Sequence, residues 1–147
     1  RAFQAMRGVS TIVSATVAAE VGDFSRFSTA SKFMSYLGLT PSEHSSGPKV
    51  ARGAITKAGN THVRHKLIQA AWHYRHRPAL TRTLAKRQEG LPQPIRDIAW
   101  RAQHRLNRKY RTMTARSKTP QVAVVAVARE LSGFLWSIGQ EVQSSTS

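Results

Sequence analysis

The sequence predicts an all-α fold, because apolar residues recur every three to four positions along most of the chain and no stretch alternates as a β-strand would. A length of 147 residues fits one domain, or a larger and a smaller subdomain. Hydrophobic residues make up 40% of the chain, which is enough for a folded core. We therefore expect helices packed around a common core.

The first forty residues predict a helical corner followed by a short helix. Apolar spacing indicates a short helix, a turn at residues 8–10 and a second helix that ends near Val21. This unit resembles a helix-hairpin-helix, whose turn amides bind a DNA phosphate, although Ser10 stands where many such motifs have Gly. A simple helical corner explains the same pattern. Ser28 is a suitable N-cap for the next helix, and Gly38 suits the position just after its end.

Residues 38–60 predict a long ordered loop or a β-like excursion, because they contain Pro41, Pro48 and several glycines and show no helical period. Small hydroxyl residues beside Gly47 let backbone approach a phosphate closely. On residue types alone, the loop either binds an anion or carries a serine that attacks phosphorus, a reaction that requires cations around it. The nearby cations are Lys49, Arg52, Lys57 and Arg64.

Four helices are predicted after this loop. Asn60 or Thr61 begins the first, which Pro78 ends, and a short helix follows over residues 81–88. Pro94 suits the first position of a long helix. A break at residues 117–120 separates it from the last helix. We divide the chain into residues 1–77, which contain the loop at 38–60, residues 78–143, which form basic C-terminal helices, and a disordered tail at 144–147.

The charge indicates a polyanionic partner. The chain has 23 Lys and Arg against 7 Asp and Glu, a formal net charge of +16, which argues against an ordinary metabolic enzyme and favours nucleic acid. A membrane is the weaker alternative, since no apolar run approaches the ~18 residues of a spanning helix. On the long helix, Asp97 is the only acid between Gly90 and Arg129, so we interpret its basic face as a nucleic-acid contact. That face carries Arg101, His104, Arg105, Arg108 and Arg111.

Metal chemistry finds little support within the chain. The absence of cysteine excludes disulfides and thiolate zinc sites and fits a reducing cytosol. The pairs His62/His65 and His73/His76 each share a helical face but lack further ligands, so we predict no metal site and favour nucleic-acid contacts for them. The seven acids are scattered, which argues against a two-metal nuclease.

The loop carries a resemblance to a known family. The pattern Gly38-Leu39-Thr40-Pro41, Ser46-Gly47, Arg52-Gly53 and Ile55-Thr56-Lys57-Ala58-Gly59-Asn60 up to Arg64 resembles the C-terminal transposase domain of the IS-one-ten insertion-sequence recombinases, which are guided by a bridge RNA. Upstream, residues 6–27 are similar to the segment that precedes this loop in the family.

The resemblance implies a serine nucleophile, which is Ser46 by position in the motif, with Ser45 as the alternative one residue earlier. It also implies an N-terminal RuvC-like domain whose acidic tetrad holds Mg²⁺. Since this chain has no such tetrad, we expect a fragment that holds no cofactor itself and is not active alone. The implied partners are DNA, a bridge RNA and further copies of the protein.

Two hypotheses follow. In the first, the chain is the catalytic C-terminal half of a transposase in the prokaryotic cytoplasm, at the nucleoid. Ser46 is then the nucleophile, and His44 is a candidate base. In the second, it is a non-catalytic nucleic-acid-binding module of ribosomal or nucleoid type. The predicted nucleic-acid contacts are Lys49, Arg52, Lys57, Asn60, His62, Arg64, Arg101, Arg105 and Arg108.

Overall fold

The computed structural model describes residues 1–39 and 60–146, and every regular element in them is helical. The all-α prediction is therefore confirmed. In chain order the elements are η1 (Ala2–Ala5), α1 (Thr11–Val21), η2 (Phe24–Arg26), α2 (Ala30–Tyr36), α3 (Thr61–Ala71), η3 (Trp72–Arg75), α4 (Arg82–Gln88), α5 (Gln93–Ala115) and α6 (Pro120–Thr146), the η elements being 3-10 helices.

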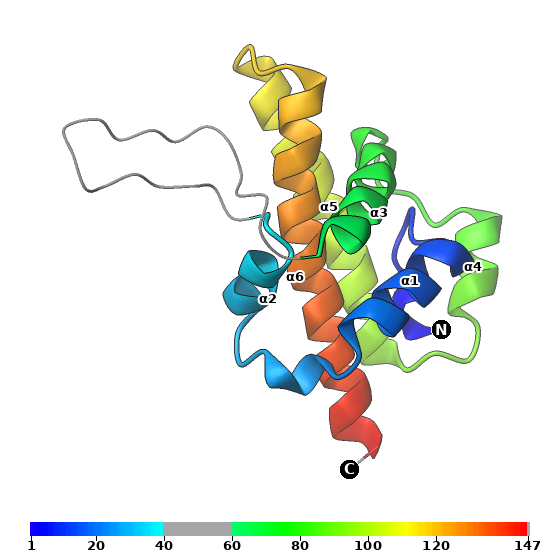
Figure 1. The fold of residues 1–147 in the computed structure, drawn as a ribbon. Helices are drawn as coiled ribbons and strands as arrows, with labels where there is room; N and C mark the ends of the chain where they lie inside the picture. Colours follow the sequence, from blue (N-terminus) through cyan, green and yellow to red (C-terminus); the bar gives the residue numbers. More distant parts are fainter. Residues whose placement is uncertain (40–59, 147) are drawn as a thin grey trace, which may run out of the picture.

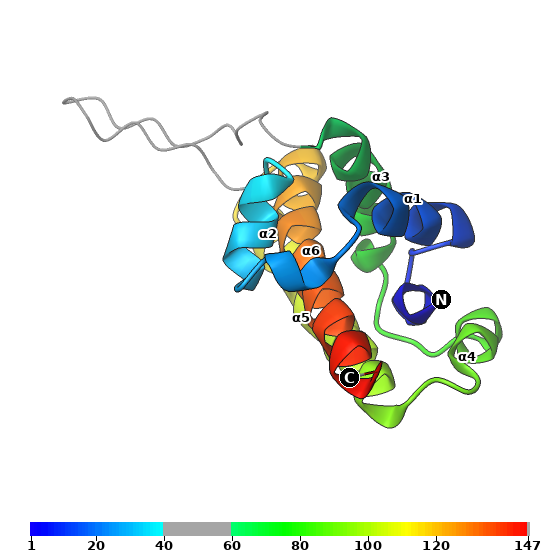
Figure 2. The same cartoon turned by 60° about the horizontal axis from the view of Figure 1, so that its bottom comes forward.

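Helix α6 is the element around which the others pack. It runs the length of the molecule with α5 beside it, α2 on one side and α1 and α3 on the other (Figures 1 and 2). Leu131, Leu135 and Ile138 of α6 are fully buried. Burying a side chain of this kind contributes roughly 1.5–3 kcal/mol. The apolar stripe of α6 is therefore the centre of the core.

The length of α6 corrects one expectation. By length and composition α6 could cross a membrane, although no apolar run near that size is expected from the sequence. In the structure, 56% of its apolar stretch is buried inside the fold. Arg129 and Glu130 also lie in the middle of the helix. Its hydrophobicity is thus accounted for by contacts with α2, α3 and α5.

Local capping rules explain the ends of α2 and α3. Asn60 caps α3, its Oδ1 accepting the N–H of Val63 at 3.0 Å, as predicted. Gly38 has a φ of 71°, and the N–H of Leu39 donates to the carbonyl of Met34 at 3.0 Å, which is the glycine-ended motif expected there. The N-cap of α2 is Thr29 and not Ser28, since the Thr29 hydroxyl accepts the N–H of Lys32.

Other boundaries differ from the predictions by short stretches. Pro92 is the N-cap of α5, so Pro94 occupies the second helical position and not the first. The helix α3 changes to η3 at Trp72, ahead of Pro78. Helix α6 continues to Thr146, through most of the stretch expected to be a disordered tail, and the Ser144 hydroxyl donates back to the carbonyl of Glu141 at 3.1 Å.

The opening turn is a buried corner. Its first half is the single short 3-10 helix η1, and the side chain of Val9 is fully buried. Arg87 of α4 donates to the carbonyls of Val9 (3.1 Å) and Met6 (3.3 Å). The turn is thus packed against the protein, and the helical-corner interpretation fits better than a hairpin that presents its amides to DNA.

Gly8 gives a test of this packing. It has a φ of +81°, and a Cβ there would lie 2.6 Å from the Ala70 carbonyl oxygen. We expect Gly8→Ala to lower the free energy of unfolding by about 3 kcal/mol, from an unfavourable backbone conformation of roughly 1–2 kcal/mol and overpacking of roughly 1–3 kcal/mol. Gly90→Ala is the control, because Gly90 has a φ of +79° with no atom within 4 Å of the added Cβ.

The measurement is urea unfolding followed by circular dichroism. Gly90→Ala should cost only the backbone contribution, about 1–2 kcal/mol. Equal losses for both variants would show that the corner does not pack tightly against α3.

Candidate nucleic-acid interface

The two ends of segment 40–59 are tied to each other by the helices that flank it. The N–H of Asn60 donates to the carbonyl of Tyr36 at 3.2 Å. Nη1 of Arg64 donates to the carbonyl of Leu37 at 3.4 Å, and the side chain of Leu39 is fully buried. We call these contacts the stem. Both points at which the chain leaves and re-enters the described structure are therefore held against the core.

Several predicted site residues lie within that segment. The candidate nucleophile Ser46, its alternative Ser45 and the candidate base His44 lie outside the described residues. The same is true of the cations Lys49, Arg52 and Lys57. Their roles remain predictions.

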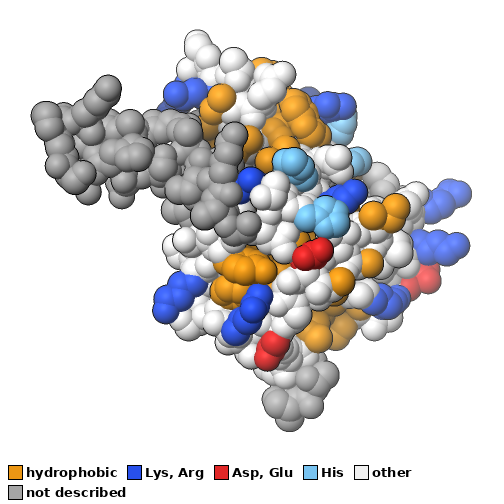
Figure 3. Space-filling view, viewed as in Figure 1, with side chains coloured by type: hydrophobic (Ala, Val, Ile, Leu, Met, Phe, Trp, Pro, Cys, Tyr) orange, Lys and Arg blue, Asp and Glu red, His pale blue; other side chains and the backbone are white. Residues whose placement is uncertain are grey.

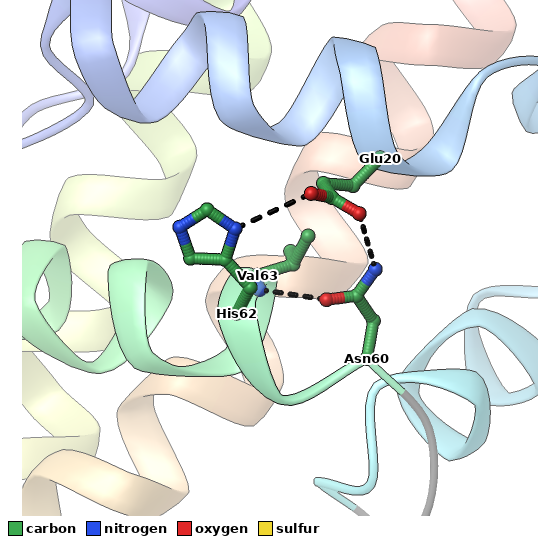
Figure 4. Close-up of polar contacts among 4 residues, drawn as sticks. All are labelled: Glu20, Asn60, His62 and Val63. Carbon is green, nitrogen blue, oxygen red and sulfur yellow. Dashed lines mark hydrogen bonds and ion pairs between the residues drawn. The ribbon is translucent and has the colours of Figure 1, made fainter.

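A polar cluster fixes the α3 side of the stem (Figure 4). Nδ2 of Asn60 donates to Glu20 Oε2 at 3.0 Å, and Nδ1 of His62 lies 3.3 Å from Glu20 Oε1. These contacts lower the pKa of Glu20, the Asn60 hydrogen bond having the larger effect and His62 the smaller one. Both polar groups of the Asn60 side chain are engaged within the protein, whereas His62 remains exposed. No local pattern in the sequence indicates this role for Glu20, because 40 residues separate it from Asn60.

Arg64 also belongs to the stem. Its side chain is buried, with 6% of the residue exposed. Besides Leu37, its guanidinium contacts the hydroxyl of Thr61 at 3.5 Å. A helix leaves its last carbonyls without intrahelical partners, and Arg64 satisfies one of them at the end of α2. In the described structure Arg64 therefore supports the stem from inside, and contact with a phosphate remains a prediction for it.

The basic face of α5 lies opposite its buried stripe, as predicted. The side chains of Arg101, His104, Arg108 and Arg111 are exposed, while Ile98, Ala102 and Leu106 are buried. Figure 3 views the molecule from the side on which α6 lies in front of α5, and there too Lys, Arg and His side chains are spread over the surface with few acidic ones between them.

Arg105 corrects the prediction that this whole face lacks acidic partners. Its Nε and Nη2 donate to the two carboxylate oxygens of Glu130 on α6 at 2.7 and 3.2 Å, and Lys109 lies 3.6 Å from the same carboxylate. The hydrogen bond to Glu130 raises the pKa of Arg105. Arg105 sits at the edge of the exposed face, where α5 meets α6, so the neighbouring helix supplies the missing acid.

A groove opens between α5 and the segment that follows η3. It encloses about 520 Å³ and no carboxylate lines it. Among the described residues, the guanidinium groups of Arg108 and Arg111 have no hydrogen-bond or ion-pair partner. The groove depends on Pro78 lying against α5, which Asn107 enforces by donating to the carbonyls of Tyr74 and His76 at 3.1 and 3.0 Å. Its lining is Pro78, His104, Asn107, Arg108, Arg111, Thr112 and Ala115.

This arrangement is suited to binding phosphates and not to holding a metal. Within residues 1–39 and 60–146, no group of three His, Asp or Glu side chains is placed to ligate a metal ion. Uncompensated guanidinium groups along a groove instead match the spaced negative charges of a nucleic-acid backbone.

The Glu20 cluster makes stability depend on pH. Because the pKa of Glu20 is lowered in the folded state, its stabilising effect is present above the unfolded value of about 4.3 and is lost as the pH falls through the folded one. We expect wild type to be more stable than Glu20→Gln at pH 7 and the difference to shrink below about pH 4. Urea unfolding across this range measures it, with the exposed Glu89→Gln as control. A difference that is constant with pH would contradict a role for the Glu20 charge.

Comparisons with known proteins agree with these features. A family model described as "Transposase IS116/IS110/IS902 family" matches residues 1–86. The putative transposase y4qE of Sinorhizobium fredii is 46% identical over 146 residues, which are 99% of this chain and 37% of that protein. A probable family 20 transposase of Pseudomonas aeruginosa is 40% identical over 67 residues, 46% of this chain and 20% of that protein.

The transposase for insertion sequence element IS1111A of Coxiella burnetii is 37% identical over 68 residues, 46% of this chain and 19% of that protein. The chain thus spans little more than a third of the length of the Sinorhizobium relative and about a fifth of the other two. The family match covers more than half of the chain, including α1, α2, α3 and the stem. The chain belongs to the Transposase IS116/IS110/IS902 family.

Proposed function

We propose that this chain is the part of a DNA transposase that carries its serine nucleophile. The observation that carries the proposal is the family match over residues 1–86, which include the stem and segment 40–59. The net charge of +16 and the basic groove on α5 support DNA as the substrate. We place the protein on DNA in the prokaryotic cytoplasm, acting with a bridge RNA and further copies of itself.

In this proposal the Ser46 hydroxyl attacks a phosphorus of the DNA backbone. The bond from that phosphorus to one bridging oxygen breaks, so that the freed strand end becomes a hydroxyl and the protein becomes joined to DNA by a phosphate ester. Lys49, Arg52 and Lys57 neutralise the charge that builds on the non-bridging oxygens. The hydroxyl proton passes to a base, for which His44 is the candidate in this chain.

Mg²⁺ belongs elsewhere in this proposal. The acidic side chains in the described part of the chain form no group that fits the ion. We therefore assign Mg²⁺ to a RuvC-like domain outside this chain, where it would supply Lewis-acid chemistry at the phosphate.

A non-catalytic nucleic-acid-binding module is the second candidate. The groove on α5 favours it, because Arg108 and Arg111 can bind phosphate whether or not a serine reacts. The two candidates differ in whether protein and DNA become covalently joined.

Substitution of Ser46 separates them. In the longer transposase that contains this chain, we expect Ser46→Ala to abolish strand exchange and covalent protein–DNA adducts. Loss of one hydroxyl should change the free energy of unfolding by less than ~1 kcal/mol. Ser45→Ala is the matched control and should keep most activity. Activity lost only in Ser45→Ala would identify Ser45 as the nucleophile instead of Ser46. Activity kept in both variants would favour the non-catalytic binding module.

The charges on α5 give a second test. Arg108 has no partner among the described residues, whereas Arg105 is held by Glu130. If both candidates bind DNA through phosphates, Arg108→Gln should reduce the slope of log K against log[salt] by ~1, and Arg105→Gln should reduce it less. Fluorescence anisotropy with a labelled duplex over a range of salt measures both slopes. Equal slopes for both variants and wild type would contradict binding through the α5 face.

A further inference from the structure

An exposed aromatic residue on α5 is not explained by the core or by the proposed chemistry. Trp100 is 44% exposed, whereas Ile95, Ile98 and Leu106 of the same helix are at most 6% exposed. The exposed part of this large apolar ring forgoes the stabilisation that its burial would provide. A tryptophan on a strongly basic face therefore invites a ligand with a flat, unsaturated surface.

Trp100 and the basic groove form one continuous surface. The rings of Trp100 and His104 meet edge to face, with centroids 4.7 Å apart and an interplanar angle of 79°. His104 also lines the groove together with Arg108 and Arg111. Residues 100, 104, 108 and 111 follow each other along one face of α5, over about 16 Å of helix. We call these four residues the α5 stripe.

We propose that the α5 stripe binds unpaired nucleotides, with a base stacked on Trp100 and the adjoining phosphates on Arg108 and Arg111. Bases within a duplex are already stacked on both sides. The exposed ring of Trp100 on α5 therefore has a base face to stack on where a base is unpaired. Stacking on an aromatic side chain tolerates any base, since every base has a π-face, and the cations of the groove follow the backbone. The inference rests on the proposed nucleic-acid function and specifies that the α5 stripe binds single-stranded nucleic acid in preference to a duplex.

The charge on the stripe favours this ligand over an apolar protein partner. The groove is lined by three basic side chains and by no acidic one. Asp97 of α5 lies one turn before Trp100 and accepts a hydrogen bond from Gln93 at 2.7 Å, and Glu130 of α6 is paired with Arg105. Removal of the ring should therefore affect single strands, while removal of the charges should affect every nucleic acid.

The experiment measures the affinity of the full 147-residue chain for three labelled probes by fluorescence anisotropy. The probes are an oligothymidylate, an oligouridylate of the same length, about 15 nucleotides, and a duplex of matched length. We expect Trp100→Ala to weaken binding of the single strands at least fivefold and binding of the duplex less than twofold. Trp100→Phe should stay within threefold of wild type, and Arg108→Gln with Arg111→Gln should weaken all three probes. Tighter binding of the oligouridylate would identify RNA as the source of the unpaired bases. Tighter binding of the oligothymidylate would identify DNA.

Tryptophan emission provides a second readout that does not depend on the alanine variant. Trp72 and Trp136 are half-buried, and Nε1 of Trp136 donates to the carbonyl of Phe27 at 2.8 Å. Oligothymidylate should quench wild-type emission, and Trp100→Phe should bind it without that quenching. Ile12→Ala is the matched control, since Ile12 is 67% exposed on α1, and it should change no affinity.

Equal weakening of single-strand and duplex binding by Trp100→Ala would contradict the proposal that the α5 stripe prefers unpaired nucleotides, as would quenching that persists in Trp100→Phe. Neither outcome would contradict duplex binding or the proposed transposase function. Absence of binding to all three probes would contradict both the proposed role of the α5 stripe and the nucleic-acid function on which that role rests.

Discussion

Burial of the apolar stripe of α6 is the constraint on which the remaining structure depends. Helix α6 contacts α2, α3 and α5 along its length, and residues such as Leu131, Leu135 and Ile138 have no exposed surface. Helix α5 gains its orientation from this contact, because its own buried stripe must face α6. Once α5 is oriented in this way, the arginines on its opposite side are necessarily exposed. The position of the basic face is therefore a consequence of how the core packs.

The same core holds the stem at a defined place. Helices α2 and α3 both pack on α6, which brings the end of one and the beginning of the other together. Polar contacts then complete the junction: Asn60 bonds to Tyr36 and Glu20, and Arg64 bonds to Leu37. Two residues that sequence motifs assign to phosphate binding thus also have structural partners. In the described structure these two motif residues join the end of α2 to the beginning of α3.

The distribution of charge on α5 and α6 separates cations that are neutralised from cations that are available. Glu130 is shared by Arg105 and Lys109, so its single negative charge neutralises one of the two positive charges at the edge of α5 nearest α6. The opposite edge, at the groove that contains Arg108 and Arg111, has no such acid. A net charge of +16 describes the chain as a whole, whereas this pairing decides which face a polyanion meets.

The sequence by itself determined the helical class, most helix ends and the family, because helical periodicity, caps such as Asn60 and Gly38, and motifs depend on neighbouring residues. It could not identify Glu20 as the partner of Asn60, Glu130 as the partner of Arg105, or the groove against Pro78, since these contacts join residues at least 25 positions apart. It left the corner at Val9 as one of two interpretations, and it could not show that the Val9 carbonyl accepts a hydrogen bond from Arg87. Such contacts exist only after the helices have packed on α6, because packing, and not local preference, decides which side chains meet.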